Sequence, residues 1–396
     1  MSKIAIISEH FFPYNDNANT SCTESVAKGL ADCGEDVTVF SKSFANTVPT
    51  FEKKDGIKIV RYFYEKQEKI DSNFGIKSDN IFTRFSVAVL TSLIYKIETK
   101  KVRKFYAEKI KNEKFDYVIS VSNPFMNHET AKYIKSKAPK THWIAYYYDP
   151  YSFNNVKNKF ENSFRNFHEK HALKKAEKII ALEGIIKEYG DNKFFPFSPN
   201  AEIFETTLPI LEIKKKTEKK PHTKQKLLYV GRFYEDIRRP DELINLLGKL
   251  DSEEYEALFF GSCCEYLKLH FDSLPLCIKL CGSVSNEDCG KLIEDADIVL
   301  NVGNKNSNQI PSKIFEYISY GKPIINFYDN ENDTSLKILK EYPSVFNIKN
   351  GTDYSVNDVE NFCENSTEIS EEKLEKIYEN FLSKNVIKAI RYFVIK

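Results

Sequence analysis

Two segments near the start of the chain, Lys3-Ile-Ala-Ile-Ile-Ser8 and Asp36-Val-Thr-Val-Phe40, decide the class of fold. Both are short apolar runs of the kind that forms buried strands. A polar loop and a stretch of helical character from Ser21 to Cys33 lie between them. A strand, a helix and a second strand in this order predict a βαβ crossover. The chain is therefore expected to begin with a parallel sheet.

The same alternation continues through the first half of the chain. Further apolar strands are expected from Tyr117 to Val121, Trp143 to Tyr147 and Lys178 to Leu182, with segments of helical character between them. This pattern predicts a parallel sheet that is covered on both faces. It breaks around Pro196 to Asn200, and the Lys-rich stretch from Leu211 to Lys226 offers few core-forming residues. We therefore expect the domain junction in this region.

A second series of strands follows the junction, with helical segments such as 241–250 and 287–295 between them. Its members are expected at Leu227–Val230, Ala257–Phe260, Ile278–Cys281, Ile298–Leu300, Pro323–Ile325 and Ser344–Phe346. The second half is again doubly wound. The fold class is therefore α/β, with two Rossmann-like domains facing a cleft. We expect residues 1–205 to form the first domain, residues 206–370 the second, and residues 371–396 terminal helices that pack back on the first.

Length and composition agree with two soluble globular domains. The 396 residues exceed what one hydrophobic core usually serves, and 41% are hydrophobic while 29% are charged. The 58 basic and 57 acidic side chains leave a net charge of +1, which does not indicate a nucleic-acid partner. The eight cysteines lack the paired CxxC spacing of a zinc site, so reduced, buried thiols and no metal are expected.

The first apolar run, Ile4 to Ile7, is too short for a secretion signal, so the protein is expected in the cytoplasm. No apolar run approaches the roughly 20 residues that span a bilayer, so any membrane contact would be peripheral.

Basic side chains follow the first strand of the second half. Gly231-Arg232-Phe233 comes directly after Val230, and Arg238 and Arg239 follow before a helix that begins near Asp241. Glycine lets a phosphate approach the backbone, and guanidinium groups bind phosphate oxygens in bidentate fashion. Arg232 and Arg238 could thus neutralise a diphosphate. The alternative is a solvated basic helix start.

The segment Asn308-Gln-Ile-Pro-Ser-Lys-Ile-Phe-Glu316, which continues to Pro323, is the densest in groups that bind ligands. It begins a helix beyond a predicted strand, where free backbone amides bind phosphate and where Ser312 and Lys313 add a hydroxyl and a positive charge. Glu316 could accept hydrogen bonds from a ribose diol. In the alternative interpretation Ser312 is a cap and Glu316 a surface acid.

At these motifs the chain resembles the retaining glycosyltransferases of the GT-B fold, in particular the large family four of bacterial polysaccharide enzymes. The resemblance covers nearly the whole chain and is most specific at Leu228–Arg232, Leu280–Val284 with Ala296-Asp297, Pro311–Glu316, and Gly321–Ile325. It implies that Arg232 and Arg238 bind the diphosphate of a nucleotide sugar. It also implies that Gly231 contacts the donor, that the backbone at Gly282, Ser283 and Val284 reads the base, and that Glu316 holds the ribose.

The sequence departs from the family pattern at two places. Asn308 stands where the first glutamate of the Glu-x7-Glu motif contacts the transferred sugar, and Asn308 or Gln309 could replace it as neutral hydrogen-bonding partners. Asn15-Asp-Asn-Ala-Asn19 replaces the usual Gly-Gly of the amino-terminal loop. The small polar residues Asn15 and Asn19 keep a phosphate or sugar contact possible.

Acceptor-side candidates follow strands of the first half. Asp149, after the strand that ends at Tyr147, is expected to orient the acceptor hydroxyl, although an Asp-Pro pair is more often simply a turn. Ser122 and Asn123 follow the preceding strand, and Glu9 and His10 follow the first. These four residues are weaker candidates for the same cleft, and His10 has an equal claim to a structural role.

Residues 82–106 combine apolar side chains with Arg84, Lys96, Lys100, Lys101, Arg103 and Lys104. Such a helix could lie on an anionic membrane and meet a lipid-linked acceptor. An ordinary helix that packs on the first sheet has an equal claim.

Residues and resemblance together predict a hexosyltransferase-type glycosyltransferase. It would move a sugar from a nucleotide-sugar donor, with UDP as the expected nucleotide, to a saccharide or lipid-linked acceptor in polysaccharide, capsule or glycoconjugate synthesis. The nucleotide sugar is a substrate, and no cofactor is expected. Asp149, Arg232 and Arg238 would act in the transfer, with retention at the anomeric carbon implied by the resemblance. The alternatives are a catalytically silent partner subunit that binds nucleotide sugars and a nucleotide-sugar epimerase of the same fold.

Overall fold

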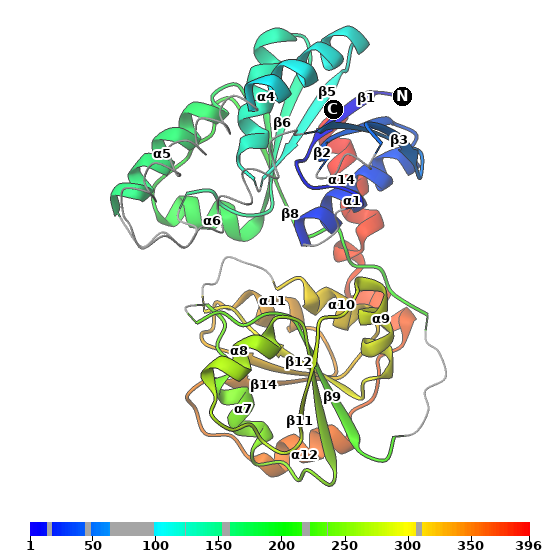
Figure 1. Ribbon diagram of the computed structural model, residues 1–396, viewed down its shortest axis with the longest axis vertical. Helices are drawn as coiled ribbons and strands as arrows, with labels where there is room; N and C mark the ends of the chain where they lie inside the picture. Colours follow the sequence, from blue (N-terminus) through cyan, green and yellow to red (C-terminus); the bar gives the residue numbers. More distant parts are fainter. Residues whose placement is uncertain are drawn as a thin grey trace. The chain divides into compact units, whose positions relative to one another are not determined.

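The structure, a computed structural model, describes residues 1–13, 18–43, 49–63, 99–122, 124–152, 159–215, 222–235, 237–305 and 311–396 (Figure 1). The chain divides into two compact units, Met1–Pro209 with Lys384–Lys396, and Ile210–Ser383. The first segment thus runs to Pro209 instead of residue 205. Residues 371–383 belong to the second unit, whereas the expected terminal segment began at 371.

The first unit contains an eight-stranded sheet in the order β3-β4-β2-β1-β5-β6-β7-β8. Its strands are β1 (Lys3–Ile7), β2 (Asp36–Ser43), β3 (Phe51–Lys54), β4 (Ile57–Phe63), β5 (Tyr117–Val121), β6 (His142–Tyr147), β7 (Lys178–Leu182) and β8 (Glu202–Thr206). Its helices are α1 (Ala18–Asp32), a helix at 99–113, α4 (Met126–Lys137), α5 (Lys159–Leu173), α6 (Glu183–Asp191) and α14 (Ser383–Ile395). All neighbouring strands pair in parallel except β3 and β4, and the central strand β1 is buried from Ile4 to Ile7.

The strands that the sequence analysis missed lie at the margins of this sheet. β3 has an alternately exposed and half-buried pattern, and β8 is largely exposed, so neither is a continuous apolar run. The turn between β3 and β4 is Asp55-Gly56, whose φ angles are both positive, 49° and 78°. An Asp-Gly pair is a strong local signal for a hairpin, so the sequence did carry evidence for β3 and β4.

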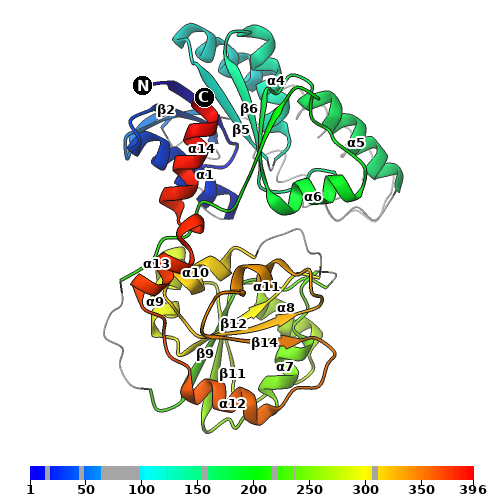
Figure 2. The same cartoon turned by 180° about the vertical axis from the view of Figure 1, so that it is seen from behind.

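The carboxyl-terminal helix α14 returns to the first unit and packs beside α1 (Figures 1 and 2). A Cβ atom added at Gly29 of α1 would lie 2.5 Å from Cδ1 of Ile387, so the absence of a side chain there permits the contact. Arg391 donates from Nε to Oε1 of Glu35 at 2.8 Å. Burial acts to raise the pKa of Glu35, but hydrogen bonds from Ser2 N and Arg391 outweigh it, so the pKa is lowered.

The second unit contains a six-stranded sheet in the order β11-β10-β9-β12-β13-β14, with every pair parallel. Its strands are β9 (Gln225–Val230), β10 (Tyr255–Phe260), β11 (Ile278–Gly282), β12 (Ile298–Val302), β13 (Ile324–Tyr328) and β14 (Val345–Lys349). Its helices are α7 (Asp241–Leu247), α8 (Cys263–His270), α9 (Asn286–Asp295), α10 (Lys313–Ser319), α11 (Thr334–Leu339), α12 (Val356–Asn365), α13 (Glu371–Ile377) and the 3₁₀ helix η1 (Glu379–Phe381). This order confirms the doubly wound fold that the sequence predicted.

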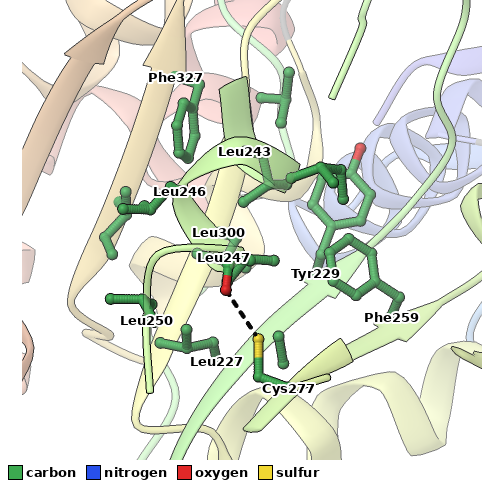
Figure 3. Packing of buried hydrophobic residues seen from close by; sticks show 14 of the residues in the cluster. Leu227, Tyr229, Leu243, Leu246, Leu247, Leu250, Phe259, Cys277, Leu300 and Phe327 are labelled. Carbon is green, nitrogen blue, oxygen red and sulfur yellow. Dashed lines mark hydrogen bonds between the residues drawn. The ribbon is translucent and has the colours of Figure 1, made fainter. Parts of the chain in front are cut away.

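The core of the second unit forms where α7 packs on the sheet (Figure 3). Its apolar side chains come from several strands and from α7 and the residues after it. The labelled members are Leu227, Tyr229, Leu243, Leu246, Leu247, Leu250, Phe259, Cys277, Leu300 and Phe327. Cys277 also donates from Sγ to the carbonyl oxygen of Leu247 at 3.3 Å, which ties the start of β11 to the end of α7.

A ladder of amides crosses the other half of this sheet. Asn301, Asn326 and Asn347 occupy paired positions on β12, β13 and β14. Asn301 donates to Asn326 at 2.7 Å, and Asn326 donates to Asn347 at 2.8 Å. The ladder satisfies polar side chains inside an otherwise apolar sheet, because each amide can both donate and accept.

All eight cysteines are free thiols, and six of them are buried. Cys33 is half-buried and Cys281 is exposed, which corrects the expectation that all would be buried. Among the described residues, no helix is long and apolar enough to cross a membrane, and no group of three or more His, Cys, Asp or Glu side chains is arranged to hold a metal ion.

Glu169 is a fully buried acid that joins α5 to α6 and to the loop after β6. Its Oε1 accepts from the hydroxyl of Tyr189 at 2.6 Å, and its Oε2 accepts from the backbone nitrogen of Ser152 at 3.2 Å. Burial raises the pKa of Glu169, although these hydrogen bonds oppose the shift. The native state therefore holds a proton that the unfolded chain releases, so the free energy of unfolding falls as the pH rises above the unfolded pKa of about 4.3.

We expect Glu169→Gln to flatten this part of the pH profile of stability. The amide oxygen can accept from Ser152 while the amide nitrogen donates to the Tyr189 hydroxyl, and nothing in that pair titrates. The wild type should lose about 1.4 kcal/mol for each unit by which its folded pKa is raised, whereas the variant should not. Urea unfolding across mildly acidic to neutral pH measures this, with exposed Glu202→Gln as the control. Parallel profiles for Glu169→Gln and the wild type would contradict the assignment.

Candidate functional site in the second unit and its counterpart in the first

The order of strands in the second unit reverses between β9 and β12, because β10 and β11 lie on one side of β9 and β13 and β14 on the other. Ligands of doubly wound sheets bind beyond the carboxyl ends of the strands at this point. The loops after β9, β10, β11 and β12 all begin at that edge. They contain most of the donor-binding residues that the sequence analysis named.

Gly231, Gly261 and Gly282 allow the backbones of these loops to pack closely against one another, and we call this backbone surface the floor of the site. The nitrogen of Gly231 donates to Phe260 O at 2.9 Å, and the nitrogen of Gly261 donates to Gly282 O at 2.7 Å. A Cβ atom added at Gly261, whose φ is +102°, would lie 2.6 Å from the carbonyl oxygen of Gly231. Side chains are therefore excluded where the two loops meet, which leaves the backbone open to a close ligand. The sequence analysis missed Gly261, although it follows β10 just as Gly231 follows β9.

Arg232 leans from this floor toward the loop after β10. Its Nε donates to the hydroxyl of Ser262 at 2.9 Å, and its Nη1 donates to the hydroxyl of Tyr234 at 3.3 Å. The side chain is exposed, so most of its donors face solvent. Neutral hydroxyl partners orient the guanidinium and leave its charge uncompensated, which is the state that a phosphate group needs.

Arg238 leans the other way, toward the loop after β12. Its Nε donates to Oδ1 of Asn304 at 3.0 Å, so it bridges the point where the strand order reverses. Burial raises the pKa of Tyr229, and the positive charge of Arg238 opposes that shift. Arg232 and Arg238, the two residues predicted to bind the diphosphate, thus point to opposite sides of the end of β9, where Gly231 lies. Asn304 and Ser262, which hold them, were not predicted.

Asp333 packs against Gly303 in the loop after β12. It is buried, and its Oδ1 accepts from the backbone nitrogen and hydroxyl of Ser335 at 2.8 and 2.7 Å, which caps α11. Burial raises the pKa of its carboxyl, against the effect of Arg238. Its Oδ2 lies 2.0 Å from the position that a Cβ atom of Gly303 would take. Gly303 therefore determines how closely Asp333 and the Asn304 loop approach each other.

Helix α10 carries the other predicted donor ligands. Lys313 Nζ donates to both carboxylate oxygens of Glu316, at 2.8 and 2.7 Å, and lies 3.4 Å from Sγ of Cys289 on α9. Burial acts to lower the pKa of Lys313, but the negative charge of Glu316 outweighs it, so the pKa is raised. Burial also raises the pKa of Cys289, so this thiol is a neutral partner. Ser312 precedes the helix without a side-chain capping bond.

The remaining donor candidates are less defined. Ser283 is exposed and Val284 half-buried in the loop before α9, where Ser285 caps the helix by accepting from Asp288 N at 3.1 Å. Gly282 has a φ of +80° and no atom within 4 Å of an added Cβ, so its surroundings are open. Asn308 and Gln309 lie outside the described residues.

One part of the motif that carries the resemblance, Gly321-Lys322, contributes to the fold. Lys322 is buried, and its Nζ donates to Ala296 O at 2.9 Å and to Glu368 Oε1 at 2.5 Å. A Cβ atom at Gly321, whose φ is +67°, would lie 2.4 Å from the carbonyl oxygen of Ile369. Gly321-Lys322 therefore holds the chain after α12 against the end of α10.

In the first unit, the corresponding edge brings three predicted acceptor-side residues together. Asn19 on α1 donates from Nδ2 to Asp149 Oδ2 at 3.1 Å. The hydroxyl of Ser122, after β5, accepts from the backbone nitrogens of Tyr148 at 2.7 Å and Asp149 at 3.3 Å. Asp149 is half-buried, and Asn19 contacts only its Oδ2 atom and not Oδ1. The arrangement presents a carboxylate in a fixed orientation.

The other acceptor-side candidates have different surroundings. Glu9 is held by Lys42 at 3.1 Å, with both side chains largely buried, so an acceptor hydroxyl would have to compete with that ion pair. The carbonyl oxygen of His10 accepts from the hydroxyl of Ser8 at 2.8 Å, and its side chain is half-buried. Asn15 and Asn123 lie outside the described residues.

We expect Gly303→Ala to destabilise the second unit by about 1 to 3 kcal/mol, because the new methyl group must displace Asp333 or the Asn304 loop. Asp333 cannot move freely while Ser335 holds its other oxygen. The control is Gly248→Ala after α7, where the nearest atom would lie 3.5 Å away and where alanine should be neutral or mildly stabilising. Thermal unfolding measures both, and equal midpoints would refute the proposed packing.

No protein-family model matches the chain, and no curated protein matches its sequence. Solved structures do match over nearly its full length. Sucrose-phosphate synthase from Thermosynechococcus elongatus is 13% identical with a TM-score of 0.65, and the match covers 99% of this chain and 98% of that one. TarM is 11% identical with a TM-score of 0.60, covering 100% and 95%. An E. coli trehalose-6-phosphate synthase bound with UDP-2-fluoro glucose is 12% identical with a TM-score of 0.59, covering 100% and 98%. The chain therefore has the fold of the GT-B glycosyltransferases.

Proposed function

We propose that this protein transfers a glycosyl group from a nucleoside-diphosphate sugar to a saccharide or lipid-linked acceptor. The observation that carries the proposal is the pair of guanidinium groups at the end of β9. Arg232 and Arg238 are each held by a neutral side chain, Ser262 and Asn304 respectively, beside a floor of backbone that excludes side chains. Cations that hydrogen-bond to neutral side chains beside open glycine backbone fit a diphosphate better than they fit a neutral ligand.

A UDP-sugar is the proposed donor. The similar E. coli structure contains UDP-2-fluoro glucose, and Glu316 on α10 has the carboxylate that a ribose diol would need. In the free protein that carboxylate accepts two bonds from Lys313. Donor binding would then exchange one of these bonds for a ribose hydroxyl, while Lys313 remains available to a phosphate oxygen.

In the proposed reaction, the bond between the sugar's anomeric carbon and the diphosphate oxygen breaks, and a bond from that carbon to the acceptor oxygen forms. Arg232 and Arg238 stabilise the negative charge that develops on the departing diphosphate, so we propose that no metal ion is needed. Asp149, oriented by Asn19 and Ser122, would position the acceptor hydroxyl. Retention at the anomeric carbon is proposed from the resemblance.

We also propose a place for the reaction, on the cytoplasmic face of a membrane, in polysaccharide or capsule synthesis. Of the segment 82–106, only the part from residue 99 is described. Tyr106 faces the sheet and donates to Ser41 O at 2.5 Å, while Lys100, Lys101 and Lys104 are exposed. Arg103 pairs with Glu129. This helix therefore packs on the sheet along one side and exposes lysines on the other, which supports the proposed contact with an anionic surface.

Transfer measured against a panel of nucleotide sugars tests the proposal directly. Release of UDP that depends on an acceptor would support it. Binding of a nucleotide sugar without turnover would instead indicate a silent partner subunit, and isomerisation of the free donor would indicate an epimerase.

We expect Glu316→Ala to weaken UDP-sugar binding by about 1 to 3 kcal/mol, because a ribose diol loses its charged acceptor. Folding should be preserved, since the carboxylate is partly exposed. Isothermal calorimetry provides the measurement. The control is Glu331→Ala, which removes a similar acid from its ion pair with Lys349 elsewhere in the same unit. Equal affinity in both variants would remove Glu316 from the site.

We expect Arg232→Ala and Arg238→Ala each to lower kcat by about 10²- to 10³-fold while changing stability far less, because each stabilises charge on the leaving group. Arg239→Ala is the matched control, since Arg239 is exposed and is already paired with Asp241 at 2.9 Å. Activity should persist in a metal chelator. A strict requirement for magnesium, or an equal loss in Arg239→Ala, would contradict this account.

A further inference from the structure

Helix α5 presents aromatic residues on the side that faces away from the protein. Phe164 and Phe167 are 63% and 73% exposed, whereas Glu169, Ala172 and Leu173 are buried on the opposite side. A helix on a globular protein normally places its large apolar residues toward the core. Two exposed phenylalanines one turn apart, on an otherwise well-anchored helix, therefore mark a contact surface.

Basic residues predominate among the described side chains of α5 and the residues that follow it. Lys170, Lys174 and Lys175 are exposed and Arg165 is half-buried, and among residues 163–175 the only carboxylate is the fully buried Glu169. We name the exposed residues Phe164, Phe167, Lys170, His171, Lys174 and Lys175 the α5 face.

The neighbouring helix α4 does not supply a compensating negative charge. Its Glu129 lies between His168 Nε2, at 2.5 Å, and Arg103, so that carboxylate is already paired within the unit. Lys132 on α4 donates to His171 O at 2.8 Å. Burial lowers the pKa of Lys132, the negative charge of Glu129 opposes this shift, and the positive charges of Lys175, Arg103 and Lys174 add to it. Basic residues therefore predominate where the α5 face adjoins α4.

We propose that the α5 face docks the first unit on an anionic lipid bilayer. Aromatic side chains that enter the interface, surrounded by lysines that meet acidic head groups, are the two components of peripheral membrane binding. The α5 face lies on a different helix from Lys100, Lys101 and Lys104, although Glu129 of α4 contacts both helices through His168 and Arg103. It is also formed by described residues throughout, and Figures 1 and 2 show α5 at the outer margin of its unit, beside α6.

Sedimentation of the full chain with vesicles tests the proposal. Binding should be stronger to phosphatidylcholine vesicles that contain phosphatidylglycerol than to phosphatidylcholine alone, and it should weaken as salt is added. The double variant Phe164→Ser, Phe167→Ser should reduce the partition coefficient by about tenfold or more, and so should Lys170→Glu, Lys174→Glu. Unchanged unfolding midpoints would show that these exposed substitutions leave the fold intact.

The matched control is Leu269→Ser, Leu276→Ser, which removes apolar side chains that are 80% and 90% exposed in the second unit. It should bind vesicles like the wild type. Absence of wild-type binding to acidic vesicles would overturn the proposal. It would also be overturned if the phenylalanine variant bound normally while Lys100→Glu, Lys101→Glu abolished binding, or if the phenylalanine variant only converted a dimer into a monomer. No donor is present in the assay, so its outcome is independent of the proposed transferase activity.

Discussion

The arrangement of the second unit depends on one close backbone contact, between the carbonyl group of Gly231 and the α-carbon of Gly261. The loops after β9 and β10 meet there with no space for a Cβ atom. Because Gly261 N also binds Gly282 O, the same contact locates the end of β11. A larger residue at Gly261 would separate three strand ends at once. The position of Arg232 depends on this contact as well, since its partner Ser262 is the next residue along the chain.

Electrostatic balance distinguishes three kinds of cation in the second unit. Lys322 is buried and fully engaged by carbonyl oxygens and Glu368, so its charge serves the structure. Arg232 and Arg238 donate to neutral oxygens, which orient the two guanidinium groups. Lys313 lies between these two cases. Its charge is paired with Glu316, but that carboxylate could accept from another donor in place of Lys313. Only residues of the last two kinds can respond to a ligand at low energetic cost.

The sequence was sufficient for the features that follow from continuous apolar runs. The strands from Tyr117 to Val121 and from Lys178 to Leu182 were predicted with their observed bounds, because parallel strands buried on both faces have uninterrupted apolar sequences. β8 was missed because an exposed edge strand lacks that signal. α14 was expected to be a helix that packs back on the first domain, but its contacts with Gly29 and Glu35, which are far from it in the sequence, could not be read from the pattern.

The residues of the candidate site also divide into those that the sequence predicted and those that it did not. Arg232, Arg238, Lys313 and Glu316 could be named from local patterns, since each follows a strand or begins a helix. Ser262, Asn304 and Cys289 could not, because their roles arise from the neighbouring positions of loops that the sheet order brings together. The positions that orient a ligand-binding group are thus harder to read from sequence than the group itself. Asp149 illustrates the point from the other unit. An Asp-Pro pair alone indicates a turn, and only its contacts with Asn19 and Ser122, on two other elements, give the carboxylate a fixed direction.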